Sequence, residues 1–124
     1  MQNVRDNKFS ALLAQEATLA PEAKRLFHEA ILWGRLEMCQ WLHATFGLTS
    51  ADVRAQDNWA LRSAAQYGYL GVCSWLHATF ALTPADARAW DNWALRGAAE
   101  NGHLAVCRWL HATYSLTPAD ARAV

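Results

Sequence analysis

The sequence predicts an all-α solenoid, in which helix pairs are joined by short helical turns with little or no β-structure. Leu48–Ala81 and Leu82–Ser115 align end to end and differ at eleven of 34 positions, so the chain repeats every 34 residues. Each copy contains two amphipathic stretches separated by a glycine, which is typical of a pair of short helices. A repeat this short cannot bury its apolar face alone, so successive copies are expected to stack side by side.

The repeat period divides the chain, which is expected to form a single repeat domain over residues 1–124. Residues 9–47 are expected to form a diverged N-terminal capping unit, followed by full repeats at 48–81 and 82–115. Residues 116–124 begin a further repeat and stop before its first main helix. Phe27–Phe46 keeps the second part of the pattern, whereas the residues before Phe27 have lost it, as an end cap requires. No such cap is apparent in the sequence at the C-terminus.

Each full repeat opens with a signal for the start of a helix. In the copy from Leu82, Thr83 is a suitable N-cap and Pro84 suits the first helical position. Asp86 stands three residues after the cap, as in a capping box. We therefore expect a short helical turn over residues 84–89. The copy from Leu48 repeats the pattern with Ser50 in place of Pro84.

Two longer helices follow in each repeat. Asp91 or Asn92 is expected to cap a helix that runs from Trp93 to about Asn101, and Gly102 is expected to end it in a left-handed conformation. A second helix is expected over residues 103–113, with its apolar residues on one broad face.

The N-terminal unit departs from this plan. Residues 9–17 are typical of a polar-edged helix, and Pro21 is expected at the start of the next helix, which runs to Trp33. Gly34 breaks that helix, and residues 35–45 are expected to form the second helix of the unit.

Apolar residues that recur at the repeat period are expected to form the core. Trp75 lies between Trp41 and Trp109 in one such set of equivalent positions. Buried side chains of this kind hold neighbouring repeats together. The residues expected in the structural core are Leu61, Cys73, Trp75, Leu76, Leu95, Cys107, Trp109 and Leu110.

Composition limits the classes of function. The 11 basic and 11 acidic residues give no net charge, and no block of like charge occurs, so nucleic-acid and membrane partners are not expected. The first residues lack the basic and apolar runs of a signal peptide, and no apolar stretch is long enough to span a membrane. Three cysteines at equivalent positions suit a reducing compartment, so a cytoplasmic location is expected.

The helix pair resembles an ankyrin repeat. The resemblance rests on the Leu95, Ala98 and Ala99 trio, the Gly102-His103-Leu104 turn, and the series Val106, Cys107, Trp109 and Leu110, and it covers about residues 21–124. It implies a curved stack of helix pairs whose inner helices and connecting segments bind another protein. The chain departs from the family by opening with Trp93-Ala94-Leu95-Arg96 and by a connection without glycine, which looks helical.

Several groups of residues that recur with the repeat have both a chemical and a structural interpretation. Cys39 and His43, with their equivalents one and two repeats later, are spaced to share a helix face, but two ligands per repeat fall short of a zinc site. The recurring arginines are interleaved with aspartates, so we expect surface ion pairs rather than a phosphate-binding surface. Asp57-Asn58-Trp59 and its equivalent are expected to cap and staple a helix. No nucleophile motif or phosphate loop occurs, so we predict no catalytic residue, no metal and no cofactor.

The eleven positions that differ between the two full repeats are candidates for recognition. Most are polar-tolerant and are expected to face solvent, where neutral drift explains the differences as well as recognition does. On ankyrin geometry, part of this set lies on the connecting segment and the inner helix, and Trp90, Tyr67 and Arg88 are the expected anchors. The partner-binding residues predicted in this way are Gln56, Ser63, Gln66, Tyr67, Arg88, Trp90, Gly97, Glu100 and Asn101.

Two functions remain open at this stage. The first is a non-catalytic protein–protein interaction module that presents a rigid helical surface to another protein. The second is a structural subunit that assembles with copies of itself, head to tail, through an uncapped C-terminal end, to give rings or filaments. The partner's identity does not follow from the sequence.

Overall fold

The computed structural model describes residues 16–121, which fold entirely into helices, turns and connecting segments. No β-strand occurs in this part of the chain, as the repeat pattern predicts. Within it, none of the helices has the length and apolar character needed to span a bilayer. The helices are α2 (Glu16–Leu32), α3 (Leu36–Phe46), α4 (Ser50–Gln66), α5 (Leu70–Phe80), α6 (Pro84–Ala87), α7 (Ala89–Glu100), α8 (Leu104–Tyr114) and α9 (Pro118–Ala121).

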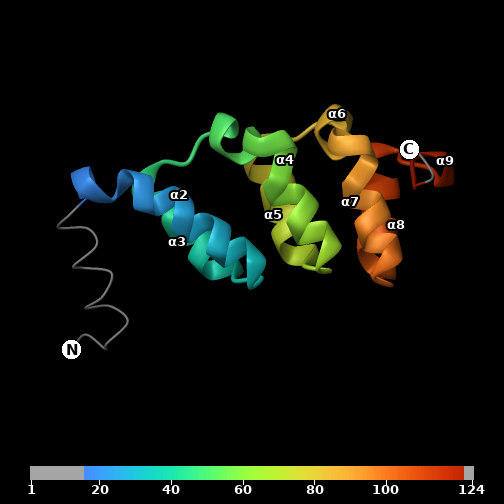
Figure 1. The fold of residues 1–124 in the computed structure, drawn as a ribbon, viewed down its shortest axis with the longest axis horizontal. Helices are drawn as coiled ribbons and strands as arrows, with labels where there is room; N and C mark the ends of the chain where they lie inside the picture. Colours follow the sequence, from blue (N-terminus) through green and yellow to red (C-terminus); the bar gives the residue numbers. More distant parts are fainter. Residues whose placement is uncertain (1–15, 122–124) are drawn as a thin grey trace.

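The longer helices form three pairs that lie side by side in a row (Figure 1). Each pair packs internally, α2 on α3, α4 on α5 and α7 on α8. The first helix of each pair also contacts the first helix of the next pair, so α4 lies between α2 and α7. The second helices α3, α5 and α8 contact one another in the same order. The 34-residue repeat of the sequence is therefore a repeat in space.

A glycine reverses the chain within each pair. Gly34, Gly68 and Gly102 have φ of 66°, 79° and 74°, the left-handed region that other residues enter at a cost. At the last of these turns, the amide of Gly102 donates to the carbonyl of Ala99 and that of His103 donates to Ala98, at 3.1 and 2.9 Å. These two bonds satisfy carbonyls at the helix end and define a Schellman motif. The predicted role of the glycine is confirmed.

Capping boxes start the units, as the sequence predicts. The hydroxyl of Thr83 accepts from the amide of Asp86, and the carboxylate of Asp86 accepts from the amide of Thr83. The same reciprocal pair joins Thr49 to Asp52 at the start of α4. Before α9, the carboxylate of Asp120 again accepts from the threonine that precedes the helix, at 2.7 Å from its amide nitrogen.

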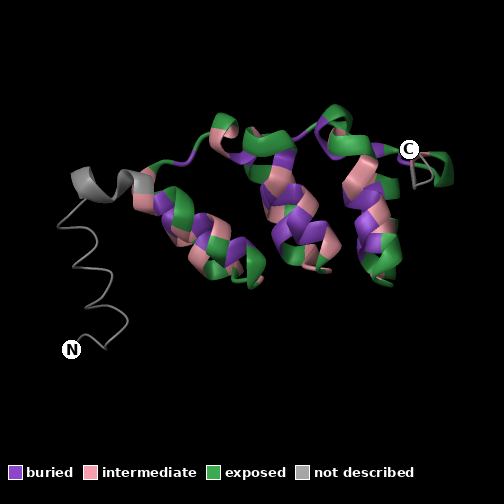
Figure 2. Cartoon of the chain, in the orientation of Figure 1, coloured by how far each residue is buried: buried purple, intermediate pink, exposed green. Residues whose placement is uncertain are grey.

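The core lies between the helices of each pair and between neighbouring pairs (Figure 2). Of the eight predicted core residues, Leu61, Cys73, Leu76, Leu95 and Leu110 are buried. Trp75, Trp109 and Cys107 are instead half-buried and pack against the edge of the core. Indoles are too large to be enclosed by two thin helical layers. Cys107 lies in α8, in the last helix pair of the described residues.

Two local predictions are wrong. The helix α2 already begins at Glu16, so Pro21 lies within it rather than at its start. Asp91 and Asn92 do not adopt the extended conformation of an N-cap but lie at φ of 56° and 59°, inside a left-handed turn. The predicted helix over residues 9–17 falls largely outside the described residues.

The central position of Trp75 makes its contribution to stability testable. Its indole contacts Phe27 and His43 of the first pair and Phe80 of its own, with ring centroids 5.5–6.4 Å apart. Trp109 contacts only His77 and Tyr114 among the described rings. We expect Trp75→Ala to lower the free energy of unfolding by about 3 kcal/mol, and Trp109→Ala by roughly half as much. Urea denaturation measures both, and equal losses would contradict the assignment of the larger contribution to the indole with more ring contacts.

Candidate functional site

We call residues 49–58 and 83–92 the connecting segments. Each ends in three successive residues in a left-handed conformation, which form a kink inside α4 and α7. Gln56, Asp57 and Asn58 have φ of 55–59°, and Trp90, Asp91 and Asn92 have φ of 56–59°. None of these residues is glycine, and the left-handed conformation costs roughly 1–2 kcal/mol per residue. We call each set a left-handed turn. A conformation this costly persists only where the surroundings hold it in place.

Arginines that lie after the turns in the same helices, Arg62 in α4 and Arg96 in α7, hold these turns. Arg62 donates to the carbonyls of Asp57 and Gln56, at 2.8 and 3.0 Å. Arg96 donates to the carbonyl of Asp91 at 2.9 Å. These carbonyls thus receive charge-assisted hydrogen bonds. The sequence showed these arginines only as a recurring surface residue, and their role was missed because it depends on a backbone conformation that residue types alone do not indicate.

The second left-handed turn presents Trp90 to solvent. Its side chain is 56% exposed although it is large and apolar. The guanidinium carbon of Arg62 lies 4.5 Å from the Trp90 ring centroid, and the Trp93 ring packs edge-on at 5.5 Å. Trp93 is fixed in turn, since its indole nitrogen donates to the side-chain carbonyl of Gln66 at 3.2 Å. Trp90 is therefore exposed but held in one orientation.

A column of ion pairs runs beside the turns. Arg54 donates to both carboxylate oxygens of Asp86, at 2.9 and 3.0 Å, and Arg88 donates to Asp120 at 3.1 Å. Burial alone would raise the pKa of Asp86, but the hydrogen bonds from Arg54, Thr83 and Asn58 outweigh it and hold this pKa below its usual value. These pairs join one repeat to the next, so the arginines and aspartates neutralise one another, as predicted from their interleaving.

The predicted partner-binding residues fall into two exposed groups and a buried one. Gln56, Arg88 and Trp90 lie at the connecting segments, and Arg88 is held there by Asp120. Tyr67, Glu100 and Asn101 are exposed at the C-terminal ends of α4 and α7. The helical stretch Trp59–Gln66, about 12 Å long, separates this end of α4 from its left-handed turn. The sequence thus predicted one surface, whereas the structure divides it between two edges.

The prediction that Ser63 and Gly97 bind a partner is wrong, because neither residue faces solvent. Ser63 is 6% exposed, and Gly97 is buried in the contact between α4 and α7. A Cβ at Gly97 would lie 3.2 Å from that of Gln66, so this position needs a small residue for packing. Gln66 is half-buried at the end of α4, next to Tyr67, and its backbone carbonyl accepts from the Asn101 side chain at 3.3 Å.

The cysteines and histidines do not form a metal site in the described residues, where no cluster of three or more candidate ligands occurs. Burial raises the pKa values of Cys39 and Cys73 to about 12, so both thiols stay protonated at neutral pH. His43 and His77 instead pack their rings on Phe80 and Tyr114 of the next pair, with centroids 4.9 and 5.2 Å apart. The geometry fits the interpretation of Cys39 and Cys73 as core residues and of His43 and His77 as residues at the edge of the core.

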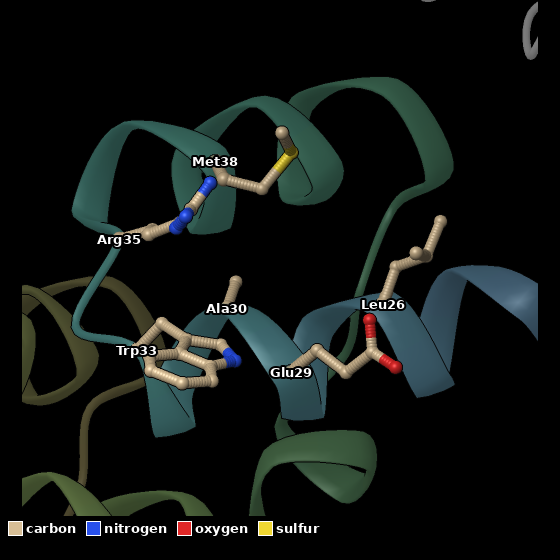
Figure 3. Close-up of a pocket in the computed structure, with 6 residues that line it drawn as sticks. All are labelled: Leu26, Glu29, Ala30, Trp33, Arg35 and Met38. Carbon is tan, nitrogen blue, oxygen red and sulfur yellow. The ribbon is translucent and has the colours of Figure 1, made fainter.

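One concavity lies outside the predicted set, between α2 and α3 (Figure 3). It measures about 280 Å³ and is lined by Leu26, Glu29, Ala30, Trp33, Arg35 and Met38. Small-molecule sites usually have about 300–1,000 Å³. The lining positions are equivalent to positions of α4 and α5 that face α2 and α3, so within the described residues this hollow lies on the first side of the stack. Trp33, 71% exposed, is its most accessible apolar residue.

Comparisons of the chain with protein-family models, with curated proteins and with solved structures give no match. The function proposed below consequently depends on the geometry of the chain itself.

The environment of His28 predicts a pH dependence of stability. Its ring packs on Trp59 with centroids 4.5 Å apart, and burial lowers the pKa of His28 below the ordinary histidine value of about 6.5. The unfolded chain therefore binds this proton at a higher pH than the folded chain does. Stability should be full above about pH 7 and fall as the pH passes 6.5 toward the lower folded pKa.

Urea midpoints between pH 7.5 and 5 measure this effect. His28→Gln should flatten the slope in this range. Asp52, Asp86 and Asp120, whose pKa values are lowered, should act only below about pH 4. A slope that survives His28→Gln would contradict the assignment.

Proposed function

We propose that the chain is a non-catalytic, ankyrin-like protein-binding module. The observation that carries the proposal is Trp90, a largely exposed indole fixed by Arg62 and Trp93 on a strained backbone. Exposed aromatic residues held in one conformation are typical binding anchors, because little side-chain entropy is lost when a partner covers them. The strained left-handed turn directs this ring outward at a defined place, and this role in binding gives a reason for the strain.

The surface proposed for the partner is the edge of the stack formed by the connecting segments. Gln56 and Trp90 lie on it, in equivalent positions of successive repeats, and exposed Asp57 and Asp91 flank them. The mixture of an aromatic anchor with polar neighbours fits a protein partner, whose interfaces combine a buried anchor with a polar rim. Tyr67, Glu100 and Asn101 lie on the other edge and are proposed as a secondary contact only for a partner that spans the inner helices.

A cytoplasmic location and the absence of catalysis form part of the same proposal. Cys39, Cys73 and Cys107 are free, which suits a reducing compartment. The buried thiols are poor nucleophiles because their pKa values are raised. The hollow between α2 and α3 is lined by no serine, cysteine or histidine, and binding is the activity that the geometry of Trp90 supports best.

Substitution of Trp90 tests the proposal. Immobilised wild-type chain and variants would be incubated with cell extract, and captured proteins identified by mass spectrometry and then titrated after purification. Trp90→Ala should weaken binding of the principal captured protein by at least about tenfold. Its melting temperature should change little, because the indole contributes edge contacts and no hydrogen bond to the core.

Trp33→Ala is the matched control, since it removes an even more exposed tryptophan from the far side of the stack. This variant should retain binding. Loss of binding in Trp33→Ala together with retention in Trp90→Ala would overturn the proposed surface, and a large fall in the stability of Trp90→Ala would assign Trp90 to the core instead.

A further inference from the structure

The repeat allows the two boundaries between neighbouring helix pairs to be compared position by position. We call the contact of α2–α3 with α4–α5 the first boundary, and that of α4–α5 with α7–α8 the second boundary. Both are closed over their apolar parts, because the equivalent residues Cys39 and Cys73 are each 0% exposed. Cys107, at the same position of the last described pair, is half-buried, so the pair that follows supplies the cover of Cys39 and Cys73.

Directional polar bonds hold the second boundary. Arg54 donates to both carboxylate oxygens of Asp86, whose side chain is only 9% exposed. The indole of Trp93 donates to the side-chain oxygen of Gln66 at 3.2 Å, and the amide of Asn101 donates to its backbone oxygen at 3.3 Å. Bonds of this kind form only at one relative position of the two pairs, so they resist both opening and sliding.

At the first boundary, the equivalent positions lack most of these groups. Leu32 stands where Gln66 stands one repeat later, and it has no side-chain oxygen to accept from an indole. The ion pair there joins Asp52 to Lys24, whose side chain is 64% exposed, and ion pairs this exposed contribute little. Tyr69 supplies one replacement, since its hydroxyl donates to the carbonyl of Leu32 at 2.9 Å.

Two equivalent histidines show the same difference. His77 Nδ1 lies 2.9 Å from the hydroxyl of Tyr114 across the second boundary. Across the first boundary, Phe80 takes the place of Tyr114, and His43 Nδ1 is buried with no hydrogen-bond partner in the described part of the chain. A buried ring nitrogen without a partner disfavours the closed state, because water can satisfy it once the boundary opens.

Ring packing gives the first boundary cohesion without fixing its geometry. Among the described residues, the ring contacts across it are Phe27–Trp75, His28–Trp59, His43–Trp75 and His43–Phe80. Those across the second boundary are His77–Trp109 and His77–Tyr114, together with the guanidinium of Arg62 over Trp90. Ring contacts tolerate a wide range of tilts and offsets. The first pair can therefore rotate against the second without breaking many directional bonds.

The connections between the pairs differ in stiffness in the same sense. The first connection, which enters α4 in Figure 1, contains Gly47 and Ser50, and the equivalent residues of the second are Ala81 and Pro84. Gly47 adopts φ of 67°, and a Cβ there would meet nothing within 4 Å, so packing does not restrict this residue. Pro84 fixes its own φ at the start of α6, whereas Ser50 does not. Residues 47–50 therefore have the composition of a hinge.

We propose that the stack opens at the first boundary, where α2–α3 swings away as a unit about residues 47–50 while α4–α5 and α7–α8 stay together. The open form uncovers Cys39 and the sides of Trp75 and Phe80 on which His43 packs. Arg62 and Trp90 lie in α4 and α7, on the part that stays closed. The inference is therefore independent of the binding function proposed for Trp90.

Thiol labelling of single-cysteine variants tests the proposal, because each buried cysteine reports the opening of one boundary. One variant retains only Cys39 and carries Cys73→Ala and Cys107→Ala. Its matched partner retains only Cys73 and carries Cys39→Ala and Cys107→Ala. Burial raises the pKa of both remaining thiols to about 12, so each reacts only when its boundary opens.

Labelling rates are measured without denaturant and at several urea concentrations below the unfolding transition. Each rate is divided by the rate of the same variant when fully unfolded in urea, which corrects for the local sequence. The corrected rate of Cys39 should exceed that of Cys73 by about tenfold or more. It should also depend less on urea, because opening one boundary exposes less surface than unfolding the whole chain.

Exchanging the connection residues tests the hinge. Ser50→Pro gives the first connection the proline of the second, and it should slow the labelling of Cys39 severalfold by restricting the open form. The converse change, Pro84→Ser, should speed the labelling of Cys73 and leave that of Cys39 unchanged.

Exchanging the ring residues tests the histidine contacts in the same way. Phe80→Tyr offers His43 a hydroxyl and should slow the labelling of Cys39 by about two- to tenfold, the range of one hydrogen bond. Tyr114→Phe removes the hydroxyl at the second boundary and should speed the labelling of Cys73 by a similar factor.

Three outcomes would overturn the proposal. Equal corrected rates for Cys39 and Cys73, with the same dependence on urea, would show that only global unfolding exposes them. Faster labelling of Cys73 would place the opening at the second boundary. Unchanged rates in all four exchange variants would show that neither the connections nor the histidine contacts control the opening.

Discussion

The structure depends on one packing interface that is used repeatedly. His43 packs on Trp75 and Phe80 of the next pair, and His77 packs on Trp109 and Tyr114 in the same way. Arg54 reaches Asp86 across the same boundary, as Arg88 reaches Asp120. Because each helix pair buries its apolar side only against a neighbour, both the stability of the chain and the position of the connecting segments follow from this one contact.

The interface also determines what remains available for binding. The inner helices contact each other closely enough to bury Ser63 and Gly97, so variable residues there serve packing. The left-handed turns lie outside that contact, and the arginines that hold them come from the helices that the stack has already fixed. A rigid stack can therefore hold an exposed tryptophan in place without enclosing it, which is the physical basis of the binding function proposed above.

Repetition made much of the fold predictable from the sequence. Helix pairs, glycine turns and threonine–aspartate caps follow from local chemistry, and the 34-residue period indicates which side chains meet. The left-handed turns were not predictable in this way, because Asp91 and Asn92 suit a helix cap as well as a left-handed conformation. The candidate surface was only partly predictable. Trp90 was identified as exposed from its difference from Gln56, but Ser63 and Gly97 also differ, and their burial depends on the distance between helices.

The repeated interface itself is tested most directly by nuclear Overhauser effects between aromatic rings in solution. His43 and Phe80, and His77 and Tyr114, are 37 residues apart in the chain, with ring centroids 4.9 and 5.2 Å apart. Side-by-side stacking predicts cross-peaks between the ring protons of both pairs at the same time. Cross-peaks in neither pair, in a chain that is otherwise helical by circular dichroism, would contradict the stack on which every other inference depends.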